Sequence, residues 1–213
     1  MITATPVSAE PTPHPEAKAV TNQLGMWTFL ATEILFFGGL FVVYTLFRLT
    51  YPEIFRQGGQ SMDFWLGTVN TAVLLTSSLF MALADRAVRA NQRALLTRCL
   101  ALTALLGLVF LGIKAYEYHG KFAEHLVPGP GFRGPPGSGP RLQIFYFLYF
   151  AMTGLHALHM LGGLAAVGWL WRLNAQGRLN SGRTEPVVIV GLYWHFVDCI
   201  WVFLYPLFYL AGR

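Results

Sequence analysis

Long runs of apolar residues recur five times along the chain. They cover about residues 25–47, 64–84, 95–118, 142–171 and 187–210. A helix needs about 20 apolar residues to cross about 30 Å of hydrocarbon, so each run predicts a transmembrane helix. The fourth run is longer, which indicates a tilted helix or one that projects beyond the membrane. The pattern therefore predicts an all-α, polytopic membrane bundle of five helices, built as one domain over residues 25–213.

Two segments lack this apolar character. Residues 1–24 are polar and contain four prolines, and we expect a disordered tail there. The tail does not have the basic region, short apolar core and cleavage site of a secretory signal, so we expect no cleavage. Residues 128–140 are dominated by proline and glycine. They predict an irregular loop between the third and fourth helices.

The charge pattern predicts the orientation of the bundle. Only 12% of the residues are charged, against about 25% in soluble domains, and 54% are hydrophobic. The net charge of +5 resides largely in short loops, where it acts as a topology signal and does not indicate a nucleic-acid partner. The loops after the second and fourth runs lie on the side of Lys18, and they carry Arg86, Arg89, Arg93, Arg98, Arg172, Arg178 and Arg183. These residues favour a cytoplasmic N-terminus and a C-terminus outside, and they place the 128–140 loop outside.

The first run contains a single acidic residue, Glu33. One interpretation is a neutral, hydrogen-bonded carboxyl that holds two helices together. The other is a titrating group near a proton path, because intramembrane acids commonly mark proton relays. Gly38 and Gly39 follow, and we expect a neighbouring helix to approach closely there.

The third run ends in a charged and aromatic stretch. Lys114 and Glu117 are three residues apart and share a helix face, so we expect them to pair. Tyr116 and Tyr118 suit the aromatic belt at a membrane interface. The favoured interpretation is anchoring and pairing at the membrane edge.

Histidines in the last two runs could form a metal site, which is the most specific hypothesis of enzymatic activity that the sequence offers. His156 and His159 share a face of the fourth run, and His195 in the fifth could supply a third metal ligand. That arrangement would describe a free-standing, metal-dependent membrane enzyme. Against it, the interior of the second run offers only hydroxyls and the Asn70 amide, which suit hydrogen bonds between helices. We therefore favour the histidines as packing partners.

The fifth run also places His195 and Asp198 three residues apart inside an apolar sequence. A charge near the bilayer centre costs about 2.5–3.5 kcal/mol on insertion scales, so both must face protein and not lipid. We expect them to bond each other or one shared partner. The two cysteines, Cys99 and Cys199, form no metal or redox motif. Neither a phosphate-binding glycine loop nor a serine hydrolase signature is present.

Motifs in all five runs resemble one family. They are Thr32–Glu33 before two phenylalanines, the N-T-x-x-L-L-x-S-S stretch from Asn70 to Ser78, the Glu117–Tyr118 pair, T-G-x-H-x-x-H from Thr153 to His159, and Y-W-H-F-V-D from Tyr193 to Asp198. Together the runs resemble subunit III of the haem–copper oxidases, in its short, five-helix bacterial form. Longer members have two further helices before the one with the glutamate. Without them, a lipid-filled cleft between the two parts would need another subunit to supply the pair.

The resemblance implies an accessory, cofactor-free subunit of a proton-pumping aerobic cytochrome c oxidase in the bacterial inner membrane. Its direct partner would be subunit I, which holds haems and copper and reduces oxygen. Subunit II and cytochrome c would be reached through the complex, and phospholipid would be bound. Glu33 would match the carbodiimide-sensitive, proton-linked carboxyl of the family. The other intramembrane polar residues would be structural or lipid-linked, with no catalytic residue and no metal ligand among them: Asn70, Glu117, His156, His159, His195 and Asp198.

Two related functions stay open at this point. The chain could instead be subunit III of a quinol oxidase, or the related accessory protein of a nitric oxide reductase, because other subunits recognise the electron donor. A transporter is disfavoured, since the sequence contains no inverted repeat and no pair of broken helices.

Overall fold

The computed structural model describes residues 15–134, 141–210 and 212, and the described chain is helical without any strand. Within these residues six α-helices follow one another, and a short π-helix (η1) comes after the last of them. Their bounds are α1 Pro15–Thr50, α2 Pro52–Gln60, α3 Phe64–Arg89, α4 Arg93–Ala123, α5 Leu142–Ala175, α6 Glu185–Tyr205 and η1 Pro206–Leu210. The all-α class predicted from the apolar runs is therefore confirmed.

Five of these helices are long and apolar enough to cross a membrane: α1, α3, α4, α5 and, together with η1, α6. Each contains one of the predicted apolar runs. The first run was predicted to begin at residue 25, but the helix that contains it, α1, begins ten residues earlier at Pro15. Proline is tolerated in the first turn of a helix, where its missing N–H would have no acceptor. The remainder of the predicted tail lies outside the described residues, as do residues 135–140 of the predicted loop, whereas residues 128–134 are irregular.

Helix α2 is absent from the sequence-based prediction. It has nine residues, too few to span a membrane, and its polar composition conceals it in a search for apolar runs. Its buried face consists of Phe55, Gly58 and Gly59. A Cβ atom at Gly58 would lie 2.4 Å from the Phe145 ring, so the glycine allows α2 to press against α5.

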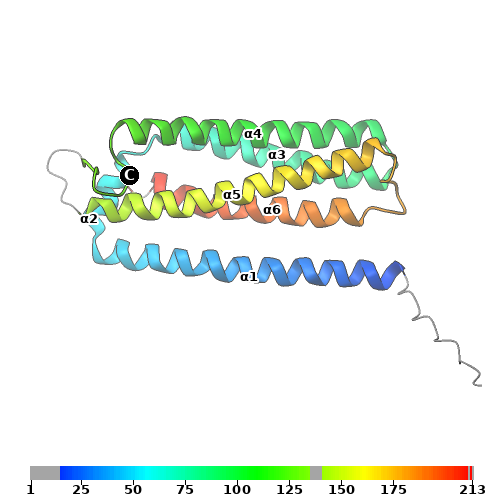
Figure 1. The fold of residues 1–213 in the computed structure, drawn as a ribbon, viewed down its shortest axis with the longest axis horizontal. Coiled ribbons are helices and arrows are strands. Elements are labelled where there is room, and N and C mark those ends of the chain that lie inside the picture. Colours follow the sequence, from blue (N-terminus) through cyan, green and yellow to red (C-terminus); the bar gives the residue numbers. More distant parts are fainter. Residues whose placement is uncertain (1–14, 135–140, 211, 213) are drawn as a thin grey trace, which may run out of the picture.

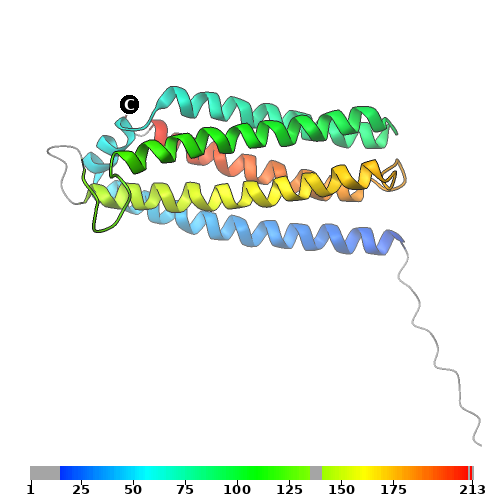
Figure 2. The ribbon, with the colours of Figure 1, turned by 45° about the horizontal axis from the view of Figure 1, so that its top comes forward.

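Helices α3 to α6 form a bundle, in which α3 contacts α4 and α6, and α5 contacts the same two. Helix α1 lies along the α5/α6 side, and Figures 1 and 2 show it at the edge of the molecule, away from α4. Only 17% of its most apolar window is buried, against 44% for α5 and α6. Helix α2 and η1 lie at the opposite end of the bundle from the start of α1 (Figure 1). The assignment of these ends to cytoplasm and outside stays a prediction.

Two fully buried tryptophans, Trp194 and Trp201, occupy the centre of the bundle. A Cβ atom at Gly107 of α4 would lie 2.9 Å from the Trp194 ring, so this glycine accommodates the indole. Gly38 and Gly39 behave differently, because no atom of the described residues lies within 4 Å of a Cβ built there. The expected close approach at these two glycines is therefore wrong within this chain, and α1 presents them on an open face.

The contact at Gly107 gives a test of the core. Gly107→Ala should destabilise the chain by about 1–3 kcal/mol, because the added methyl group must displace the buried Trp194 ring. Gly112→Ala on the same helix is the matched control, since no described atom outside its own helix backbone lies within 4 Å of its Cβ position. Alanine favours a helix over glycine, so this control should be neutral or slightly stabilising. Thermal unfolding in mild detergent measures both, and equal behaviour of the two variants would contradict the packing argument.

Candidate functional site

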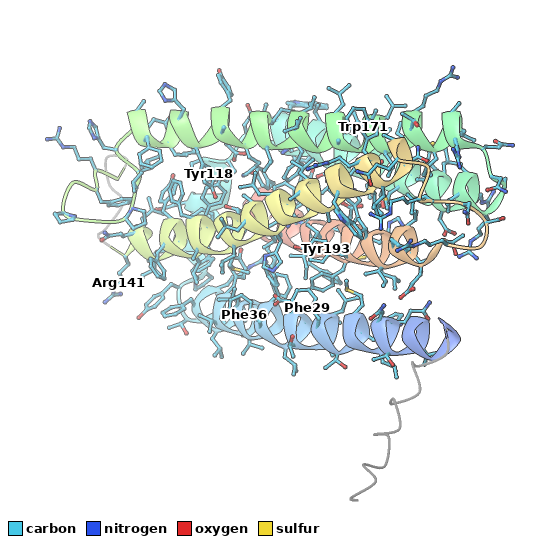
Figure 3. The ribbon with its side chains drawn as sticks, turned by 45° about the vertical axis from the view of Figure 1, so that its right-hand side comes forward. Phe29, Phe36, Tyr118, Arg141, Trp171 and Tyr193 are labelled. Carbon is cyan, nitrogen blue, oxygen red and sulfur yellow. The ribbon has the colours of Figure 1, made fainter. Side chains whose placement is uncertain are left out.

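The intramembrane acid Glu33 pairs with a histidine from another helix. Glu33 Oε2 on α1 lies 3.1 Å from His159 Nε2 on α5. Their side chains are 19% and 18% exposed, so the pair is mostly covered but can be reached from the α1/α5 face. Phe37 packs edge-on against the imidazole, and Tyr193 of α6 stacks on it and donates a hydrogen bond to the His159 carbonyl oxygen at 3.0 Å. Figure 3 shows Tyr193 directed toward α1 and Phe29.

The second nitrogen of His159 determines how this pair holds protons. Nδ1 lies 2.8 Å from the carbonyl oxygen of Leu155, which can only accept, so Nδ1 carries a hydrogen and donates it. A neutral imidazole then has an unprotonated Nε2, and Glu33 must be protonated to donate to it. The alternative is an imidazolium facing a carboxylate. In both forms one proton lies between Glu33 and Nε2, so the pair is a single proton-holding unit.

A second, fully buried network joins α4, α5 and η1. Lys114 Nζ donates to Glu117 Oε2 at 2.9 Å, and the two side chains are only 5% and 4% exposed. Tyr149 and Tyr209 accept hydrogen bonds from the same ammonium at 2.9 Å and donate to the Glu117 carboxylate at 2.7–2.8 Å. The predicted pairing is present. Aromatic rings of α5 and η1 enclose the pair, and its expected place at the membrane edge stays a prediction.

The two tyrosines beside this pair differ in position. Tyr116 is 72% exposed, as an interfacial side chain would be. Tyr118 turns into the bundle, where its hydroxyl lies 2.5 Å from Thr153 Oγ1 and its ring packs against Tyr149 and Phe150. The interfacial interpretation is therefore wrong for Tyr118, as its position on the helix directs it toward α5.

The three histidines of the alternative metal site have separate neighbours. His156 is fully buried between the rings of Phe110 and Trp201, and neither of its nitrogens has a hydrogen-bond partner among the described residues. His159 bonds Glu33, and His195 Nδ1 bonds Ser78 Oγ at 2.7 Å. The described part of the chain holds no group of three histidine, cysteine or acidic side chains that could hold a metal ion. The structure thus does not assemble the predicted ligand set.

The polar side chains of α3 form hydrogen bonds with the neighbouring helices, as the sequence predicts. Ser77 and Thr103 exchange hydrogen bonds with each other's carbonyl oxygens at 3.2 and 3.5 Å. Both buried tryptophans donate from their indole N–H to this helix, Trp194 to Ser77 and Trp201 to Thr71. Asn70 is buried and donates to the carbonyl oxygen of Phe110 at 3.4 Å. These bonds fix the register of α3 against α4 and α6.

His195 and Asp198 do not bond each other. His195 bonds Ser78, and the Asp198 carboxyl is near the same serine, but neither of its oxygens has a hydrogen-bond partner among residues 15–134, 141–210 and 212. Asp198 is 3% exposed and faces the bundle, as expected for a polar residue that must avoid lipid. The direct pair is therefore absent, and Ser78 lies beside both side chains but forms a hydrogen bond only with His195 among the described residues.

Sequence reasoning missed Tyr44, Tyr149 and Tyr209 as polar partners. The Tyr44 hydroxyl donates to the Leu207 carbonyl oxygen, and Tyr209 reaches the Lys114–Glu117 pair, so these tyrosines attach η1 to α1 and α4. A buried tyrosine usually finds a partner for its hydroxyl, and tyrosines inside apolar runs were the available signal.

Comparison with known proteins places the chain in a family. The model of the family "Cytochrome c oxidase subunit III" matches residues 8–124 and 142–213. "Cytochrome c oxidase subunit 3" of Thermostichus vulcanus is 33% identical over 201 residues, which cover 94% of this chain and 90% of the relative. The protein of the same name from Synechocystis sp. is 31% identical over 198 residues, covering 92% of this chain and 77% of the relative. "Probable quinol oxidase subunit 3" of Staphylococcus haemolyticus is 30% identical over 196 residues, with 90% and 89% covered. This chain thus belongs to the cytochrome c oxidase subunit III family and is subunit III of a haem–copper oxidase.

Proposed function

We propose that this subunit III serves a proton-pumping aerobic cytochrome c oxidase of the bacterial inner membrane. It carries no cofactor of its own and lies directly against subunit I, which holds the haems and copper. Subunit II and cytochrome c are reached through the complex. The chain supports subunit I by binding lipid, by assisting proton uptake and by sustaining turnover. Its N-terminus lies in the cytoplasm and its C-terminus outside.

The observation that carries this proposal is the Glu33–His159 pair. It is a proton-holding unit inside the membrane-spanning part of the chain, and it joins the peripheral helix α1 to α5. Its side chains remain partly accessible, so the proton can exchange with a group or water at the α1/α5 face. A purely structural contact would be served equally well by apolar side chains, because a polar pair in hydrocarbon is costly to insert.

The electron donor separates the two candidate oxidases. Relatives named for cytochrome c are 31–33% identical to this chain, and relatives named for quinol are 30–31% identical. The former supports cytochrome c, and the latter keeps a quinol oxidase as the second candidate. Purification of the complex in mild detergent distinguishes them, because the cytochrome c form contains a copper-binding subunit II and oxidises reduced cytochrome c. A complex that oxidises only quinol would establish the second candidate.

The proposed support of subunit I is tested by removing and restoring this chain. The oxidase without it should consume oxygen at nearly the initial rate of the complete complex, since the chemistry occurs in subunit I. It should take up protons more slowly and inactivate after fewer turnovers. Adding the chain back should restore both properties. Equal lifetimes and equal proton uptake with and without the chain would contradict the proposal.

A metal analysis tests the alternative of a free-standing enzyme. The isolated polypeptide should contain no stoichiometric copper, iron or zinc and show no haem absorption, because His156, His159 and His195 have separate neighbours. Elemental analysis after purification under metal-replete conditions provides the measurement. One metal ion per chain, lost in His156→Ala or His159→Ala, would instead support the enzyme.

A further inference from the structure

A polar contact lies on an open edge of the bundle, where α3 and α6 meet. Ser78 Oγ and His195 Nδ1 are 2.7 Å apart, and both residues are only half-buried. Apolar side chains beside them are exposed, with Leu75 of α3 at 51% and Val202 of α6 at 45%. Cys199, one helical turn from His195, is exposed as well. We refer to these five residues as the α3/α6 edge.

No helix within the described residues covers this edge. Helix α6 packs against α3, α5 and α1, and it lies between α3 and α1 in both views of the ribbon (Figures 1 and 2). His195, Cys199 and Val202 are spaced by four and three residues, so they share one face of α6. This face is the side of α6 that its neighbours leave uncovered, and it is directed toward the surroundings of the bundle.

The edge lies near the middle of the membrane. Ser78 is close to the centre of the span Phe64–Arg89, and His195 and Asp198 are close to the centre of the span Glu185–Leu210. The hydrocarbon layer is about 30 Å thick, so lipid headgroups and water are roughly 15 Å away on either side. Hydrocarbon offers neither donors nor acceptors. A polar partner for this edge must therefore come from protein.

Polar atoms at this depth lack partners within the chain. His195 uses Nδ1 for Ser78, and its Nε2 forms no hydrogen bond with the described residues. Beside the same serine, Asp198 is 3% exposed, and neither of its oxygens is hydrogen-bonded by a described residue. Polar groups without partners lower the stability of a bundle in hydrocarbon. Their position at an open edge indicates that a further helix completes the layer, because polar side chains hydrogen-bond across helices in membranes.

We propose that the α3/α6 edge docks a membrane-spanning helix of a neighbouring oxidase subunit, which places a hydroxyl or amide side chain against His195. The Asp198 oxygens are covered, so the edge presents an imidazole and no carboxylate. A basic side chain on the partner would bring a charge to the membrane centre without an opposite charge to contact, whereas hydroxyl and amide groups both donate and accept. This docking face deepens the proposed function and rests on it only in requiring a neighbouring subunit.

The first test uses the complete oxidase with a photoreactive benzophenone side chain in place of Val202. Illumination should join this chain to another subunit, and mass spectrometry should map the adduct to a membrane-spanning segment that contains a hydroxyl or amide side chain. A probe in place of Leu105 of α4, which is 55% exposed on a different helix, should capture lipid. Lipid capture at Val202, equal protein capture at both positions, or a captured segment without such a side chain would overturn the inference.

Substitutions of His195 test the polar contact itself. His195→Leu should make the chain dissociate from the complex roughly three- to fifteenfold more readily in detergent, the range for one hydrogen bond between membrane helices. His195→Gln keeps a group that donates and accepts, so it should restore retention. Thr76→Val is the matched control on α3, because the exposed Thr76 hydroxyl bonds the Ala72 carbonyl oxygen of its own helix. Native gels measure retention, and equal retention of the parent and His195→Leu would contradict the docking contact.

Cys199 reports whether water fills the edge in place of protein. It is exposed in this chain, and in the complete oxidase a water-soluble maleimide should leave it unmodified. Modification would reveal an aqueous cavity and overturn the inference. Oxygen consumption and turnover lifetime, measured on the same preparations, keep this docking face separate from the proposed function. A fully active, long-lived oxidase that captures lipid at Val202 would remove only the docking face.

Discussion

Replacing Glu117 by alanine should lower the thermal midpoint of the chain in mild detergent by roughly 10 °C. The reason is the isolation of Lys114, whose side chain is 95% covered and would lose the one carboxylate that bonds it among the described residues. Removing one partner of a buried ion pair costs about 3–5 kcal/mol, and 1 kcal/mol shifts the midpoint of a chain of this size by about 2–4 °C. Tyr149 and Tyr209 would also lose their acceptor, so η1 should loosen first.

The chain supplies a matched control for this prediction. Lys121 and Glu124 form a pair with the same spacing about two turns further along, but Glu124 is 59% exposed. Glu124→Ala should change stability by at most about 1 kcal/mol, because Glu124 is exposed and the buried Lys121 keeps its hydrogen bond to the Ser61 carbonyl oxygen. The double variant Lys114→Met/Glu117→Met should be more stable than Glu117→Ala, because it leaves no unpaired charge. Equal losses from Glu117→Ala and Glu124→Ala would mean that burial does not determine the strength of the pair.

The membrane-spanning helices could be predicted from the sequence alone, because a long run of apolar residues is enough to identify each of them. Each of the runs exceeds the length that a bilayer demands, and each became a helix of 21 to 36 residues. Helix α2 has no such signal. It is short and polar, and its position depends on Gly58 meeting Phe145, a residue 87 positions away in the sequence. Such a contact cannot be recognised without the packed bundle.

Among the polar residues, contacts within one helix could also be predicted from the sequence, whereas contacts between helices could not. Helical spacing predicted the Lys114–Glu117 pair, because both members lie on one turn of one helix. The Glu33–His159 contact joins helices that are far apart in the chain, and the local sequence around either residue does not predict the other as its partner. Spacing also suggested that His195 and Asp198 bond each other, whereas His195 bonds Ser78 of α3. Position on a shared face makes a pair possible, and the neighbouring helix decides whether it forms.

Glu33 should be the main intramembrane site of modification by a hydrophobic carbodiimide. The reagent reacts with a protonated carboxyl in an apolar site, and the neutral form of the Glu33–His159 pair holds its proton on Glu33. The side chain is 19% exposed, so the reagent can reach it, whereas Glu117 is 4% exposed and bound by Lys114. Peptide mapping after labelling of the complex should find the adduct on Glu33 and none on Glu117. Preferential labelling of Glu117, or a Glu33 that does not react, would indicate the imidazolium–carboxylate form.

Glu33→Gln should separate the structural from the proton-linked role of this pair. A glutamine amide can donate a hydrogen bond to His159 Nε2, so the contact between α1 and α5 is kept. What is lost is the exchangeable proton. Initial oxygen consumption in reconstituted vesicles should therefore remain close to that of the parent oxidase. Proton pumping per electron, or the number of turnovers before inactivation, should fall several-fold. Glu33→Ala removes both the proton and the hydrogen bond to His159. Any loss of complex assembly in Glu33→Ala beyond that in Glu33→Gln therefore measures the contribution of the hydrogen bond to stability. An immediate, near-complete loss of oxygen consumption in Glu33→Gln, with the haems present and subunit I folded, would place Glu33 in the oxygen chemistry itself.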